Sequence, residues 1–307
     1  MDIFLQQIIN GLTLGSVYAI VALGYTMVYG IIQLINFAHG ELVMIGAMVA
    51  FSVIGALAGT GLPPVLIVVA GILAAVPACM LVGYAMEHVA YRPLRAAPRL
   101  APLITAIGIS IILQHLALLV WSRSPLAFPQ IIPLVSFHVG GAIITGVQIA
   151  IILTSVLMMG GLTLMVYRTK LGIAMRATSQ NPQMAGLMGI DIDRIIAFTF
   201  IVGAALAAVA GVMVGTYYGI AHYGMGSLLG MKAFSAAVLG GIGNLAGAML
   251  GGILLGVVEA LGAGYIGDLT DNVFGSNYQD VFAFLVLIAV LVFRPSGLLG
   301  ERVGDRA

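Results

Sequence analysis

Long apolar segments alternate with short polar stretches along the whole chain. Four stretches contain no Asp, Glu, Lys or Arg: residues 42–86, 100–122, 124–167 and 195–231. A membrane-spanning helix needs about 20 predominantly apolar residues. The longer stretches therefore hold two spans, or one span and a neutral loop, and Pro63-Pro64 divides the first of them.

This pattern predicts eight spans, near residues 4–28, 41–60, 65–90, 101–122, 143–167, 195–218, 246–264 and 279–294. The stretch around Pro125, Pro129 and Pro133 is interpreted as an extracytoplasmic loop between the fourth and fifth spans. We expect an all-α fold, a polytopic membrane bundle of about eight helices that forms one transmembrane domain over residues 1–307.

Composition supports a membrane protein and excludes several other classes. Apolar residues make up 61% of the chain and charged residues 7%, against about 25% charged in a soluble domain. The net charge of +1 offers no basic excess for nucleic acid. The single cysteine, Cys79, excludes an internal disulfide and a thiolate-rich metal site. Neither H-E-x-x-H nor G-x-S-x-G occurs, so we predict no catalytic residue, no metal site and no cofactor.

The distribution of Lys and Arg predicts the orientation, because cytoplasmic loops are enriched in both. Ten of the 12 basic residues form three clusters: Arg92, Arg95 and Arg99; Arg168, Lys170, Arg176 and Arg194; and Arg294, Arg302 and Arg306. The loop near 265–280 carries Asp268, Asp271 and Asp280 without a basic residue and is placed outside. The three clusters and the C-terminus are then cytoplasmic, whereas the side of the N-terminus stays open.

Small residues recur every four positions, as at Gly203, Ala207, Gly211 and Gly215, at Gly243, Gly247 and Gly251, and at Gly11 and Gly15. Such spacing lets helices approach closely in lipid. It indicates a compact bundle and says nothing about the molecule that the protein handles.

Two segments interrupt the apolar pattern, the stretch Asn36-Phe37-Ala38-His39-Gly40-Glu41 and the glycine-rich stretch 240–247. Irregular backbone at membrane depth persists only where protein or a water-filled cavity surrounds it. Paired breaks are typical of transport pathways in repeat-built transporters. The tripeptide Tyr-Gly-Ile at 29–31 precedes the first break and recurs at 218–220 before the second, which suggests an internal repeat.

Four ionisable side chains lie in or near apolar segments. His39 and Glu41 either sit at a membrane interface, in contact with headgroups or water, or lie inside the bundle at a pathway. Glu87 is expected to pair with Arg92 at the cytoplasmic interface. Glu259 lies deeper, and Lys232 is its expected partner.

Residues 168–194 form the one sizeable polar insert. Asn181-Pro182 has the form of an N-cap followed by proline at the first helical position. A short helix from Pro182 to Met188 would end at Gly189, and Asp191 would cap the next span. Such a short helix is marginal alone in water, so docking to another protein would stabilise it. The alternative is a plain connecting loop.

Several ordered motifs resemble one known family. They are Thr13-Leu14-Gly15-Ser16-Val17-Tyr18-Ala19, Gly24-Tyr25-Thr26-Met27-Val28-Tyr29-Gly30, the stretch 36–41, Ala90-Tyr91-Arg92-Pro93-Leu94-Arg95, Leu187-Met188-Gly189-Ile190, the stretch 236–243 and Arg294-Pro295-Ser296-Gly297-Leu298-Leu299-Gly300. Together they resemble the permease subunits of branched-chain amino-acid ABC importers, the LivH-like member in particular. The leading glutamate of the E-A-A-x-x-x-G coupling pattern of other ABC importers is missing here.

The resemblance implies a permease that forms a translocation pathway with a homologous second permease. It also implies two ATP-binding cassette subunits, a periplasmic solute-binding protein and a bacterial inner membrane. No G-x-x-x-x-G-K-[ST] phosphate loop is present, so ATP hydrolysis is expected on partner subunits. The expected ATPase-coupling residues, at the family's coupling loop, are Arg176, Ala177, Asn181, Pro182 and Gly189. The expected pathway residues are Asn36, His39, Gly243 and Asn244.

Two alternatives stay open at this point. An ABC permease of this kind can also move urea, amides or other amino acids, because the binding protein largely selects the solute. A stand-alone secondary transporter or channel would show a similar bundle with similar breaks, and would need no ATPase.

Overall fold

The computed structural model describes residues 2–95, 97–98, 100–131, 135–139, 141–269 and 278–300. Its long helices are α1 (Asp2–Ile32), α2 (His39–Leu57), α3 (Pro64–Ala85), α4 (Leu100–Val120), α5 (Gly146–Arg168), α8 (Ile192–Tyr218), α9 (Met225–Gly240), α10 (Leu245–Leu269) and α11 (Gln279–Phe293). Shorter helices are α6 (Lys170–Gln180), α7 (Pro182–Leu187), the π-helical turn η1 (Met86–Tyr91) and η2 (Arg92–Leu94). The strands are β1 (Leu126–Ala127), β2 (Ser136–Val139), β3 (Ala142–Thr145) and β4 (Ile220–Ala221).

The protein is an all-α polytopic bundle, as the sequence predicts. All eight predicted spans coincide with helices, and seven helices in the described part of the chain are long and apolar enough to cross a membrane. The prediction missed α9, a 16-residue helix that occupies the interval before the second break. Its apolar residues are interrupted by Gly226, Gly230 and Lys232, which concealed the pattern.

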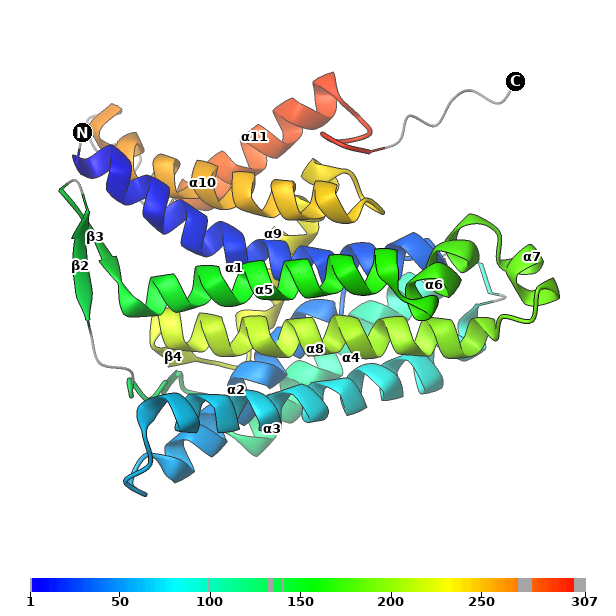
Figure 1. Ribbon diagram of the computed structural model, residues 1–307, viewed down its shortest axis with the longest axis horizontal. Coiled ribbons are helices and arrows are strands. Elements are labelled where there is room, and N and C mark those ends of the chain that lie inside the picture. Colours follow the sequence, from blue (N-terminus) through cyan, green and yellow to red (C-terminus); the bar gives the residue numbers. More distant parts are fainter. Residues whose placement is uncertain are drawn as a thin grey trace.

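The two ends of the bundle differ in character (Figure 1). The β2–β3 hairpin and the start of α1 lie at one end, and α6 and α7 lie at the other. The Gln6 side chain fixes the start of α1 to the hairpin, because it donates a hydrogen bond to the Ile143 carbonyl and accepts one from the Ile143 N–H. The start of α1 therefore lies at the end of the bundle opposite the polar insert (Figure 1).

The proline-rich loop after α4 contains short antiparallel pairs. Strand β1 pairs with β4, with Leu126 opposite Ala221, and β2 pairs with β3. Thr145 and Gln148 then form a capping box that starts α5. Pro133 lies outside the described residues, as do Arg99, Asp271, Arg302 and Arg306 of the charge pattern.

Glycine allows the central helices to touch backbone to backbone. A Cβ added at Gly15 on α1 would stand 2.7 Å from the Cα of Ile253 on α10. A Cβ at Gly211 on α8 would overlap the Val43 carbonyl of α2. The stripe residues that lie within helices therefore serve helix packing, as predicted, whereas Gly243 lies before α10 and a Cβ there would meet nothing within 4 Å. Helices α1, α2, α8 and α10 form one buried core while α3, α4 and α5 remain largely exposed.

Candidate translocation and coupling sites

The first break re-enters the bundle. Gln33 ends α1 with a left-handed φ of 55°, and α2 begins six residues later at His39. His39 packs so closely on α1 that a Cβ at Gly24 would overlap its ring. The ring of Tyr25 meets it edge to face at 4.7 Å. His39 is 1% exposed and therefore lies inside the protein, which contradicts the membrane-interface interpretation.

Asn36 organises the irregular stretch before α2. Its side-chain oxygen accepts hydrogen bonds from the Ala38 N–H at 3.1 Å and from the Tyr91 hydroxyl at 2.8 Å. Tyr91 belongs to η1, so the buried amide connects the break to the end of the α3 segment. Asn36 thus holds the backbone of the break in place.

Glu41 is also fully buried, so the interface interpretation is wrong for this residue as well. On α4, the Ser110 hydroxyl and the Gln114 amide each donate to its Oε1 at 2.8 Å. A Cβ at Gly226 would stand 2.5 Å from its other oxygen, Oε2. Gly226 lies in the first turn of α9, where the positive end of the helix dipole favours a carboxylate.

Helices α2 and α9 therefore meet at their N-terminal turns. Cβ atoms at Gly40 or Gly226 would overlap backbone of the opposite helix, and a Cβ at Gly230 would stand 3.0 Å from Gly40 Cα. Both helices follow a Tyr-Gly-Ile tripeptide at the end of a long helix. The second tripeptide, residues 218–220, is followed directly by the short connection 221–224 and then by α9. Helix α9 therefore separates the tripeptide from the glycine-rich break, which corrects the pairing of breaks predicted from the sequence.

The glycine-rich break between α9 and α10 is closed by the segment after α11. Asn244 caps α10, since its side-chain oxygen accepts from the Gly247 N–H at 3.0 Å. Its amide donates to the Leu299 carbonyl at 2.9 Å. Gly243 is exposed with a φ of 95°. The Arg-Pro-Ser-Gly-Leu-Leu-Gly motif thereby packs on this break.

The four predicted pathway residues fall into two groups. Asn36 and His39 share the first break, and Gly243 and Asn244 share the break before α10. The last turns of α1, before the first break, approach the second group, since a Cβ at Gly30 would stand 3.9 Å from Gly243 Cα. Asn36 and Asn244 stabilise local backbone, and His39 is packed among neighbours.

The polar insert folds as two helices rather than one. The predicted helix is present as α7: Asn181 accepts from the Met184 N–H at 3.1 Å and Pro182 occupies the first position. Gly189 follows with a φ of 85°, and the Ile190 N–H donates to the Ala185 carbonyl, which completes a Schellman end. The plain-loop alternative is therefore wrong, and α6 was not anticipated.

Predicted coupling residues occupy both helices of the insert. Arg176 on α6 lies over the Tyr167 ring at 5.2 Å, and the Ala177 carbonyl accepts the Asn181 N–H at the end of α6. Asp191 caps α8 through the Arg194 N–H, as predicted. At the tip of α7, Leu187 and Met188 are each 82% exposed, so an apolar surface faces away from the bundle.

An ionic cluster connects the insert to α3. Arg95 pairs with both Glu87 and Asp193, and Arg92 pairs with Asp193 and not with Glu87. The predicted Glu87–Arg92 pair is therefore wrong. Arg92 follows the π-helical turn η1, five residues after Glu87, and the next turn, η2, carries Arg95 to the buried Glu87 carboxylate. Asp193, in the first turn of α8, receives both guanidinium groups.

A second ionic cluster lies within the bundle. Lys232 Nζ is 2.7 Å from Glu259 Oε1, which confirms the predicted pair, and 2.7 Å from Asp280 Oδ1. The Tyr18 hydroxyl donates to Glu259 Oε1 at 3.3 Å. The cluster therefore joins α1, α9, α10 and α11.

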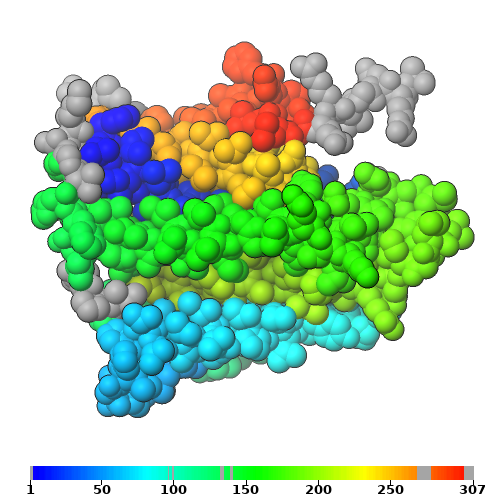
Figure 2. All heavy atoms as spheres, in the orientation of Figure 1, coloured from blue at the N-terminus to red at the C-terminus, as the bar shows by residue number. Residues whose placement is uncertain are grey.

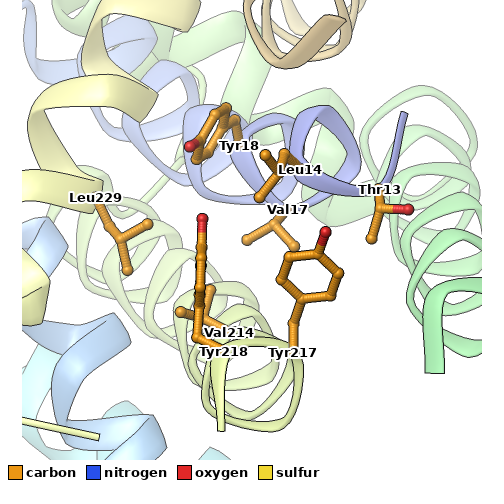
Figure 3. A pocket seen from close by; sticks show the side chains of 8 residues that line it. All are labelled: Thr13, Leu14, Val17, Tyr18, Val214, Tyr217, Tyr218 and Leu229. Atoms are coloured by element: carbon orange, nitrogen blue, oxygen red, sulfur yellow. The ribbon is translucent and has the colours of Figure 1, made fainter. Parts of the chain in front are cut away.

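A small cavity adjoins this cluster, and Tyr18, Tyr217 and Tyr218 gather around it (Figure 3). Leu14 and Val17 of α1 complete its apolar wall. Its volume of about 10 Å³ is close to the minimum for one water molecule. In this conformation the cavity is too small for an amino acid.

The family of branched-chain amino acid transport system permease components matches residues 7–291. The chain belongs to this family. The high-affinity branched-chain amino acid transport system permease protein BraD of Pseudomonas aeruginosa is 51% identical over 97% of this chain and 96% of its own length. The corresponding LivH of Escherichia coli K12 is 46% identical over the same shares. No solved structure gives a significant match.

Membership confirms the resemblance read from the motifs and identifies a multi-pass membrane permease. Its relatives are transport subunits and not enzymes. Sequence reasoning on this permease missed Ser110 and Gln114 as partners of Glu41. It also missed Gly226 and Gly230 as the α9 residues that pack against the start of α2. The spacing of the two glycines, four apart, was the available signal; nothing in the sequence marks the α4 pair.

Proposed function

We propose that this chain is the transmembrane permease of an ATP-driven importer for branched-chain amino acids in a bacterial inner membrane. It acts with a homologous second permease, two ATP-binding cassette subunits and a periplasmic solute-binding protein. The family membership and the named transport systems of BraD and LivH support the solute and the type of complex.

The exposed apolar tip of α7 is the observation that carries the coupling part of the proposal. Met184, Leu187 and Met188 are 57%, 82% and 82% exposed on a helix with defined caps at both ends. An apolar surface that is exposed to water in this way is typical of a protein–protein contact. In the proposal Arg176, Ala177, Asn181, Pro182 and Gly189 shape the segment that the ATP-binding subunits move.

Movement of α7 reaches the bundle through short, capped connections. Only the residues 188–191 separate the end of α7 from the start of α8, and they include the Schellman end of α7 and the N-cap Asp191 of α8. Asp193 in that turn is held by Arg92 and Arg95 at the end of α3. A displaced α7 therefore shifts α8 and α3 together, and the two conformations are outward- and inward-facing.

The permease domain over residues 1–307, with the insert 168–194 and the C-terminus cytoplasmic, is part of the same proposal. The basic cluster around Arg92 and Arg95 lies beside Asp193 at the α7 end, in agreement with the enrichment of basic residues in cytoplasmic loops. The N-terminus then faces the periplasm. Asn36, His39, Gly243 and Asn244 mark the two discontinuities that are proposed to border the pathway.

Purification of the tagged chain from its native membrane in mild detergent tests this proposal. We expect a second permease and two phosphate-loop ATPases in a defined stoichiometry. Recovery of the chain as an oligomer of itself, from membranes that contain those ATPases, would support a stand-alone channel or secondary transporter instead. If the binding protein of the complex bound urea or an amide, the proposed importer would stand and the proposed solute would be wrong.

A further inference from the structure

An open groove runs along α5 on the face next to α10. It is lined by Val156, Gly160, Leu164, Tyr167 and Arg168 of α5 and by Met249 of α10, with a volume of about 450 Å³. This is within the range of small-molecule sites. Figure 2 shows α5 exposed along the front of the molecule, with α10 above it.

The shape of the groove fits a flexible chain better than a second helix. Close helix contacts in lipid need small residues four apart. Here Gly160 forms the floor with no atom within 4 Å of a built Cβ, but the residues four before and after it, Val156 and Leu164, are large and more than half exposed. The groove is thus a single depression between two bulky side chains.

Its length matches one leaflet of a bilayer. The 12 residue-to-residue steps from Val156 to Arg168 rise about 18 Å along the helix, compared with about 15 Å for half of the hydrocarbon core. A hydrocarbon chain lying along Val156, Gly160 and Leu164 would therefore end at the level of Tyr167 and Arg168.

Positive charge collects at that end of the groove. Arg168 is exposed and makes no ion pair with any residue in the described part of the chain. Arg176 adds a second guanidinium above the Tyr167 ring, and Lys170 is exposed two residues beyond Arg168. Basic pockets at the cytoplasmic ends of membrane helices are suited to anionic headgroups.

We propose that this groove binds an anionic phospholipid, with an acyl chain along α5 and the headgroup phosphate at Arg168. The lipid fills the depression between α5 and α10 and neutralises the basic start of the insert. The two parts of the site are separable: the apolar wall at Gly160 takes the chain, and Arg168 distinguishes anionic from zwitterionic headgroups.

Native mass spectrometry of the purified complex, titrated with phosphatidylglycerol or phosphatidylethanolamine of equal chain length, tests the proposal. The wild type is expected to retain phosphatidylglycerol preferentially, and Arg168→Gln to lower that preference about fivefold. Gly160→Leu fills the groove and is expected to remove binding of both lipids at this site. Gly161→Leu is the matched control, because Gly161 also has open space around it and does not line the groove.

Equal retention of the two lipids by the wild type would overturn the proposal. So would equal losses in Gly160→Leu and Gly161→Leu. If Gly160→Leu instead released a co-purifying membrane protein and left lipid binding unchanged, the groove would be a protein interface.

Discussion

Lys232 Nζ lies 2.7 Å from Glu259 Oε1, and both side chains are buried within a bundle that spans the membrane. Burying two charges is costly, and their attraction offsets that cost only while both partners are present. Lys232 also faces Asp280, so its loss would leave two carboxylates without their shared cation. The pair is therefore a sensitive point of the fold.

Lys232→Met is expected to lower the free energy of unfolding by about 3 kcal/mol, because it leaves uncompensated buried charge. Thermal unfolding of the purified protein in detergent measures this. Lys232→Met combined with Glu259→Gln should recover part of the loss, since it removes one of the stranded carboxylates. An unchanged melting temperature in the single variant would show that the pair contributes little.

The glycine contact between α2 and α9 predicts a second stability effect. Gly226→Ala places a methyl group 2.5 Å from Glu41 Oε2 and 2.7 Å from the Gly40 carbonyl, so the helices must separate. We expect a loss of about 1–3 kcal/mol, measured as a lower melting temperature. Gly108→Ala on α4, with nothing within 4 Å, serves as the control and should be neutral or slightly stabilising. Equal behaviour of both variants would argue against a tight α2–α9 contact.

Arg95 and Arg92 are predicted to contribute differently to stability, although both contact Asp193. Arg95→Gln strands Glu87, which is 1% exposed, and should lower stability by about 3 kcal/mol. Arg92→Gln breaks a solvent-exposed pair, and solvent screening makes its loss much less costly. Chemical or thermal denaturation of the two variants measures which substitution destabilises the protein more. Equal effects, or a larger effect of Arg92→Gln, would contradict the prediction and indicate a uniformly solvated cluster.

Gly189 tests the shape of the coupling segment. A Cβ there meets nothing within 4 Å, so Gly189→Val acts only through the left-handed φ of 85°. We expect lower solute uptake with normal assembly of the complex. Gly189→Asn is the matched control, because Asn tolerates this conformation, and it should retain most of the uptake. Normal uptake by the valine variant in an assembled complex would contradict a coupling role.

The tip of α7 tests the docking surface. Leu187→Asp with Met188→Asp should release the ATP-binding subunits during purification and leave the melting temperature of the chain unchanged, because both side chains are 82% exposed. Gln183→Asp adds charge to another exposed position of the same helix and should retain them. Retention of the ATPases by the double variant would place their contact elsewhere.

The sequence predicted the features that local chemistry determines. Hydrophobic runs located eight helices, and Asn181, Gly189 and Asp191 marked the ends of helices through capping and backbone preferences. The Lys232–Glu259 pair followed from the scarcity of cations in apolar segments, since few partners were available.

Features that depend on tertiary packing were not predictable. Glu41 accepts hydrogen bonds from Ser110 and Gln114, which lie about 70 residues away on α4. Nothing in the sequence marks these two polar residues as its partners. Glu87 pairs with Arg95 instead of Arg92 because of a π-helical turn, and no sequence signal predicts such a turn. Helix α9 was not predicted because Lys232 and two glycines interrupt its apolar pattern. The same residues make its contacts with neighbouring helices.

Leucine uptake into proteoliposomes containing the purified complex and its binding protein tests the central claim most directly. The account predicts accumulation of radiolabelled leucine that requires ATP on the side of α7 and is lost when Leu187 and Met188 are both replaced by Asp. Leucine accumulation that proceeds without ATP, or with this chain alone, would contradict it.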